Sequence, residues 1–122
     1  MTGNTAILKF TNVSDGTGES AVKKVDVSAL EKNNKGESCT SVSISRIYWA
    51  CAGMGVNIEF DATSNVLAVG LPADSTGDEY YDLFTGIPNN AGSGVTGDID
   101  FTTKGHSSGD TYSIILVLTK NY

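Results

Sequence analysis

The chain's one histidine lies in a short segment that also contains serine and aspartate. His106 is followed by Ser107 and Ser108, and Asp110 comes two residues later. These are the residue types of a serine-hydrolase triad, but triad members are brought together and oriented by the fold, not by adjacency in a glycine-rich turn. We therefore interpret His106 as an exposed turn residue. We predict no catalytic residues, and we predict that the protein is not an enzyme.

Carboxylates are the second group of residues that could do chemistry. Glu59 and Asp61 share a strand face by their spacing of two residues, and Asp98 and Asp100 do the same. If those strands paired, the four carboxylates would meet and would suit calcium. We favour the simpler interpretation that both pairs lie on solvent-exposed faces. Zinc is also disfavoured, because one histidine and two cysteines cannot complete a four-ligand zinc site. We therefore predict no bound metal and no cofactor.

The two cysteines bracket one predicted strand. An extended segment between Cys39 and Cys51 would hold them roughly 35 Å apart, at about 3.3 Å per residue. A disulfide needs Cα atoms within about 7 Å of each other. The sequence therefore predicts two free thiols, which fits a protein made in a reducing compartment.

Length, composition and charge narrow the class of protein. The 122 residues fit a single domain, 1–122, and the formal net charge is −6. Nucleic acids and anionic membranes are bound through clustered Lys and Arg, so this charge argues against both as partners. The start, Met1–Asn4, lacks the basic residues of a signal peptide, and no apolar run spans a bilayer. We expect synthesis and folding in a cytosol.

Alternating apolar and polar residues predict an all-β fold. Val56, Ile58 and Phe60 point to one side of a strand, and similar short strands recur along the chain with glycine-rich turns between them. About eight strands in one domain are typical of a two-sheet β-sandwich, and we predict a jelly-roll-like one. Alternation alone leaves an immunoglobulin-like topology open.

Two irregularities refine this prediction. The apolar phase shifts near Arg46, which predicts either a β-bulge in the segment 40–50 or a change in which face of that strand is buried. Residues 114–118 are apolar on both faces, which predicts a central strand that is buried on both sides. We also predict a loop over 74–78 and a short strand over 80–84.

Paired aromatic residues provide the main indication of binding. In each adjacent pair one ring faces outward if the strand is regular, and exposed Tyr and Trp anchor protein interfaces or stack on sugars. The alternative, a core tryptophan with half-buried tyrosines, stays open. With a polar, glycine-rich loop over 88–97, the predicted interface residues are Tyr48, Trp49, Tyr80, Tyr81, Pro88, Asn89 and Asn90.

Three segments of the chain carry a resemblance. They are Gly86-Ile87-Pro88-Asn89-Asn90-Ala91-Gly92-Ser93-Gly94-Val95-Thr96-Gly97-Asp98-Ile99, then 103–112, and Asp61-Ala62-Thr63 followed by 65–68. They resemble segments of small structural proteins of marine tailed bacteriophages. The resemblance covers most of residues 40–122. It implies a structural part of a virion, and it supplies no catalytic residues.

From these points we expect a capsid decoration or cement protein that binds the outer shell. Its partners would be the major capsid protein or other virion proteins, together with self-association, trimers being one option. Its location would be the virion, after assembly in the host cytoplasm. The alternative is a carbohydrate-binding or host-attachment module that recognises a surface glycan.

Overall fold

A computed structural model describes residues 5–80 and 86–122. It contains eight strands and one 3-10 turn, Val27–Ala29. Among the described residues, no helix is long and apolar enough to cross a membrane. The strands are β1 (Thr5–Val13), β2 (Val22–Val25), β3 (Ser41–Ala52), β4 (Gly55–Phe60), β5 (Val66–Leu71), β6 (Thr76–Tyr80), β7 (Ile99–Lys104) and β8 (Thr111–Asn121).

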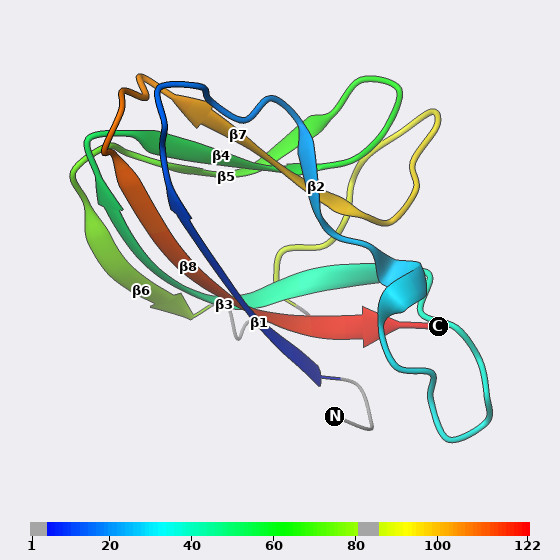
Figure 1. The fold of residues 1–122 in the computed structure, drawn as a ribbon. Helices are drawn as coiled ribbons and strands as arrows, with labels where there is room; N and C mark the ends of the chain where they lie inside the picture. The colour runs from blue at the N-terminus through cyan, green and yellow to red at the C-terminus, as the bar shows by residue number, and fades with distance from the viewer. Residues whose placement is uncertain (1–4, 81–85) are drawn as a thin grey trace.

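The strands form two four-stranded antiparallel sheets that pack face to face (Figure 1). One sheet has the order β1-β8-β3-β6, and the other has the order β2-β7-β4-β5. The first half of the chain therefore pairs with the second half strand for strand: β1 with β8, β2 with β7, β3 with β6 and β4 with β5. A long hairpin wrapped into two sheets in this way is a jelly roll. The predicted all-β sandwich is confirmed.

The core lies between the sheets and follows the predicted alternation. Val56, Ile58 and Phe60 of β4 are fully buried, as their spacing predicted. Phe101 of β7 meets Phe10 and Tyr112 edge to face, with ring centroids 5.3 and 5.8 Å apart. Aromatic pairs in this geometry stabilise a core beyond the area that they bury.

Strand β3 contains the predicted bulge. Its register with β8 shifts between Ile44 and Arg46, so Ser45 is the extra residue. The inserted residue changes which side chains face inward, and both Ile44 and Ile47 are buried as a result. Cys39, two residues before this strand, and Cys51, near its end, are free and buried, and burial raises the pKa of both thiols.

One predicted strand boundary is wrong. The segment 74–78 was expected to be a loop, but β6 covers Thr76–Tyr80 and pairs with β3. This edge strand is largely exposed, so it lacks the apolar alternation that reveals a half-buried strand. The predicted strand over 80–84 lies, apart from Tyr80, outside the described residues.

Candidate functional site

The outer face of the β1-β8-β3-β6 sheet carries apolar and aromatic side chains in register. We call it the open face. Two neighbouring cross-strand rows form its centre, because paired residues of adjacent strands point to the same side of a sheet. The first row is Ile7, Val117, Arg46 and Tyr80, and the second is Lys9, Ile115, Tyr48 and Asp78.

These side chains remain accessible although most of them are apolar. Ile7 is 55% exposed and Tyr80 is 62% exposed, while Ile115 and Val117 are half-buried by their neighbours. Together with the threonine and serine residues beside them, they line a shallow groove of about 640 Å³. Within residues 5–80 and 86–122, no second layer packs on this side of the sheet (Figure 1).

Strand β8 is central in its sheet, as the apolar run 114–118 predicted. The expectation that both of its sides are buried is wrong, however. Ile114, Leu116 and Leu118 fill the core, whereas Ile115 and Val117 point to the open face. No described element covers Ile115 and Val117 on this side. The prediction missed both as site residues because it assigned the apolar run to burial, and it did not consider Ile7.

Arg46 organises the aromatic end of the groove. Its Nε and a terminal nitrogen donate to the two carboxylate oxygens of Asp78 over 3.0 and 2.8 Å. Its guanidinium lies 4.7 Å from the ring centroid of Tyr48 and 5.3 Å from that of Tyr80. The hydrogen bonds raise the pKa of Arg46 and lower the pKa of Asp78. The pair therefore stays charged at neutral pH and holds two rings in place, which limits the entropy lost when a partner binds.

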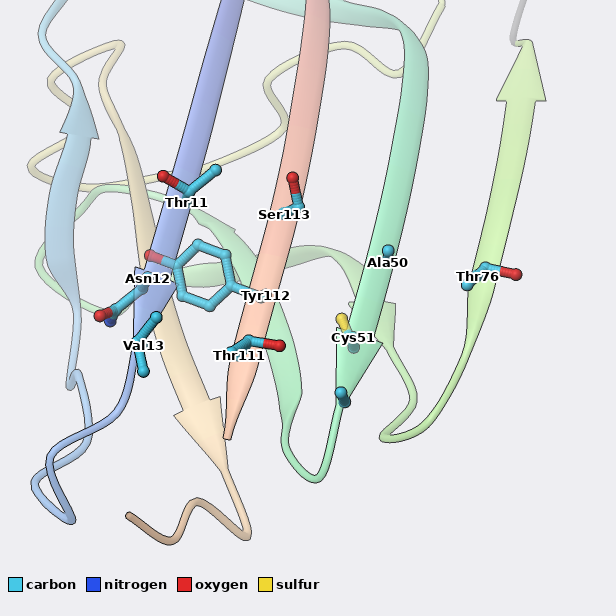
Figure 2. A pocket seen from close by; sticks show the side chains of 10 residues that line it. Thr11, Asn12, Val13, Ala50, Cys51, Thr76, Thr111, Tyr112 and Ser113 are labelled. Atoms are coloured by element: carbon cyan, nitrogen blue, oxygen red, sulfur yellow. The ribbon is translucent and has the colours of Figure 1, made fainter. Parts of the chain in front are cut away.

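The other end of the open face is a depression lined by small side chains (Figure 2). Its volume is about 550 Å³, and the row across it is Thr11, Ser113, Ala50 and Thr76. The ionisable groups beneath it are Cys51 and Tyr112, and burial raises the pKa of each. Such a surface of small side chains permits close approach of another chain.

The structure places the two residues of the first predicted aromatic pair, Tyr48 and Trp49, on opposite sides of β3. Tyr48 and Tyr80 both line the groove, whereas Trp49 points to the other side of β3 and packs, half-buried, against the core. The indole Nε1 of Trp49 donates to Ser75 Oγ over 3.0 Å. Trp49 therefore has a packing role in the folded chain. Tyr81 lies outside the described residues.

The predicted loop residues lie apart from the groove. Pro88 and Asn90 are exposed, and Asn89 is half-buried with its Oδ1 accepting from the backbone nitrogen of Ala91 over 2.9 Å. None of the three lines the groove or the depression. Their loop instead continues from Ile87, which forms a bridge with Ile44 beside the edge of the sheet.

His106 lies in the turn between β7 and β8. The segment 105–109 matches the Gly-x-Ser-x-Gly pattern in letters, but a nucleophile elbow joins a strand to a helix and this turn joins two strands. The imidazole packs on Gly18, and its Nδ1 is 3.5 Å from Thr103 Oγ1. Asp110 accepts from the backbone nitrogen of Ser107 over 2.7 Å. The expectation of an exposed histidine is wrong, because the packing of the imidazole on Gly18 leaves His106 half-buried.

The strands that carry the four carboxylates do pair, and this places all four residues on the outer face of the β2-β7-β4-β5 sheet. Glu59 pairs with Asp100 across β4 and β7, and the backbone nitrogen of Asp61 donates to the carbonyl of Asp98 over 3.0 Å. The expectation of a solvent-exposed face is wrong for Asp98 and Asp100, which are 5% and 3% exposed. In the described part of the chain, no three Asp, Glu, His or Cys side chains are arranged to hold a metal ion.

Comparison of the chain with models of protein families, with curated proteins and with solved structures gives no match.

Proposed function

We propose that this protein is a structural component of a tailed-phage virion, a capsid decoration protein that binds the outer shell through its open face. The observation that carries the proposal is the apolar surface over the centre of a sheet, which no other described part of the chain covers. A sheet normally buries one face and solvates the other, but here the solvated side presents two aliphatic residues of the central strand, Ile115 and Val117. Surfaces of this kind mark protein–protein contacts.

The charges on this face define the partner. Lys9 and Arg46 carry two positive charges and Asp78 carries one negative charge, whereas the whole chain has a net charge of −6. The open face is therefore the less acidic side of an acidic protein. It suits an apolar, neutral-to-acidic protein surface, and long-range repulsion by the rest of the chain favours binding in one orientation.

The fold and the sequence resemblance support the same assignment. Jelly rolls recur in viral coat proteins and in lectins, although a fold by itself is weak support for a function. The segments 86–99 and 103–112 resemble virion proteins, and they form the loop before β7 and the turn before β8. Many copies on a repeating shell would give tight attachment from modest single contacts, and self-association into trimers would add to it.

Electron microscopy tests the proposal. Purified protein is mixed with empty heads of the tailed phage that encodes it, and the heads are reconstructed. We expect ordered density at fixed lattice positions, with the β1-β8-β3-β6 sheet turned toward the shell. Density confined to the tail or a vertex would indicate attachment instead. Absence of the chain from purified particles in mass spectrometry would contradict a structural role.

A carbohydrate-binding module is the second candidate, because Tyr48 and Tyr80 line one groove beside the polar pair Arg46 and Asp78. Sugar sites combine aromatic rings with planar polar groups. The guanidinium of Arg46 already lies over both rings, however, and takes up part of the surface that a sugar would stack on. A glycan array with no binding at high micromolar concentration would contradict this candidate.

A further inference from the structure

The carboxylate cluster on the second sheet contains one unpaired acceptor. Asp100 is 3% exposed, and Asn65 Nδ2 donates to its Oδ2 over 3.1 Å. Its Oδ1 is buried and has no donor among the described residues. Asp61 and Asp100 lie on the same face of the sheet, because Glu59 pairs with Asp100 and the Asp61 backbone nitrogen donates to the Asp98 carbonyl over 3.0 Å. Their carboxyl groups are therefore diagonal neighbours on adjacent strands. Two ionised carboxylates in contact repel, and a buried acceptor without a donor is costly, so this arrangement requires a positive charge between them.

The neighbouring charged groups do not supply that charge. Lys23, which pairs with Asp100 across β2 and β7, directs its Nζ to Asp98 Oδ2 at 2.9 Å. On β4, Glu59 accepts from Asn65 and Thr102 and adds a further negative charge beside Asp100. Asp26, in the turn after β2, accepts from Ser28. The surroundings of the pair are thus mainly acidic.

The position of the pair links it to the loop before β7. Thr96 Oγ1 donates to Asp61 Oδ2 over 2.7 Å, and the Thr96 backbone nitrogen donates to the Asp61 carbonyl over 3.2 Å. Close by, the backbone nitrogen of Thr63 donates to the Ser93 carbonyl over 3.1 Å. Asp61 and Thr63 therefore both hold the segment 92–97 next to the end of β4, and Asp61 makes two of these three hydrogen bonds.

We propose that Asp61 and Asp100 share one proton and form a pH-sensitive clasp that holds the segment 92–97 against the end of β4. Asp100 carries the proton and donates it to the ionised carboxylate of Asp61, which also accepts from Thr96. When Asp100 loses this proton, the two carboxylates repel, the contact of Asp61 with Thr96 weakens, and the segment 92–97 loosens.

The electrostatics agree with this placement of the proton. Burial and the hydrogen bond to Asp61 raise the pKa of Asp100 to about 6, while the hydrogen bond from Thr96 lowers the pKa of Asp61. An unperturbed aspartate has a pKa near 3.9. Because the folded state raises the pKa of Asp100, the stabilisation is complete below about pH 4 and is lost as the pH rises through about 6. The loss therefore falls between mildly acidic and neutral pH.

The test measures the titration and the loop together. Carbon-13 NMR of the side-chain carboxyls follows each aspartate from pH 3 to 8, and amide hydrogen exchange reports on Thr63 and Thr96. We expect Asp100 to titrate near pH 6. After correction for intrinsic rates, we expect the two amides to exchange several-fold more slowly at pH 5 than at pH 7.5. The thermal midpoint should fall by a few degrees over the same interval.

The variant Asp100→Asn separates the clasp from a general pH effect. Its amide donates to Asp61 as the protonated acid does, so it should keep the slow exchange at pH 7.5 and should raise the thermal midpoint there. The matched control Glu79→Gln removes one exposed negative charge and should leave both unchanged. Titration of Asp100 near pH 4, or equal behaviour of the two variants, would overturn the proposal. So would stabilisation of the unmodified protein, but not of Asp100→Asn, by millimolar calcium at pH 7.5, because the occupant would then be a divalent cation.

Discussion

The two outer faces of the sandwich differ in how their side chains are paired. We call the outer side of the β2-β7-β4-β5 sheet the polar face. There Asn65 bridges Glu59 and Asp100, and Thr102 donates to Glu59 over 3.0 Å. On the open face, the central residues Ile115 and Val117 have no covering layer among the described residues. The polar face pairs most of its described polar groups within the chain, Asp100 Oδ1 and Asn57 Oδ1 being exceptions. The open face reaches its lowest free energy only when another surface covers it.

Because of this difference, we expect the two faces to affect different properties: the polar face the stability of the fold, and the open face the binding of a partner. Variants on the polar face should change the free energy of unfolding and leave binding intact, because they break internal hydrogen bonds. Variants on the open face should do the reverse, because they remove contacts that form only in a complex.

The largest expected effect is the loss of head binding in Ile115→Lys. The substitution places a charge at the centre of the open face, where a partner would have to desolvate it. We expect affinity for empty heads to fall at least about 30-fold, with the fold retained by circular dichroism. Affinity is measured by co-sedimentation with heads. Undiminished binding would show that the open face does not contact the heads.

A smaller loss is expected for Tyr80→Ala. The side chain is 62% exposed and stands beside Arg46, so its removal costs little within the free protein. As an aromatic anchor it should contribute about 1–2 kcal/mol to a complex, which corresponds to roughly 5- to 30-fold in affinity. Glu79→Gln, one residue away, is the matched control and should bind normally. Equal affinities of the two variants would place the contact elsewhere.

Asn65→Ala tests the polar face. The change removes the donor to Glu59 and Asp100 and the acceptor of the Ala62 backbone nitrogen, a hydrogen bond of 3.0 Å. We expect the free energy of unfolding, measured with urea, to fall by about 1–3 kcal/mol. Binding to heads should be unchanged. A variant that loses binding but not stability would reverse the roles of the faces.

The smallest effect is expected for Asp78→Asn, which breaks the exposed ion pair with Arg46. Exposed pairs contribute little to stability, so the thermal midpoint should change by no more than the error of the measurement. Because the hydrogen bonds from Arg46 lower the pKa of Asp78, this pair stabilises the fold above the ordinary aspartate pKa, and the contribution is lost only at lower pH. The difference between variant and parent should therefore be the same at pH 5 and pH 7.

The fold class, and which side chains of a strand point to the core, were predictable from local patterns. Val56, Ile58 and Phe60 alternate with polar residues, and alternation is a local property of a pleated strand. The strand order was less accessible, because it depends on pairs as distant as Thr5 with Thr119. Strand β6 was missed because an exposed edge strand has no buried side to impose an apolar pattern.

The candidate site was predictable in part. Adjacent aromatic residues implied that one of Tyr48 and Trp49 faces outward. Which of the two does so depends on the extra residue at Ser45, which shifts the alternation of the strand. The apolar run 114–118 was visible and was assigned to burial, since sequence alone does not distinguish a covered apolar face from an uncovered one. Asp100 was assigned to solvent because alternation predicts a side of the sheet and not the neighbours that close over it.

The most direct test compares two matched variants, Ile7→Asp and Leu67→Asp. Ile7 on β1 and Leu67 on β5 are 55% and 56% exposed, and they lie on edge strands of opposite sheets. Binding of each variant to empty phage heads is measured by co-sedimentation, with thermal midpoints as controls. We expect Ile7→Asp to lose at least about tenfold in affinity for the heads and Leu67→Asp to bind them like the parent. Equal affinities, or a loss confined to Leu67→Asp, would contradict the assignment of the open face as the docking surface.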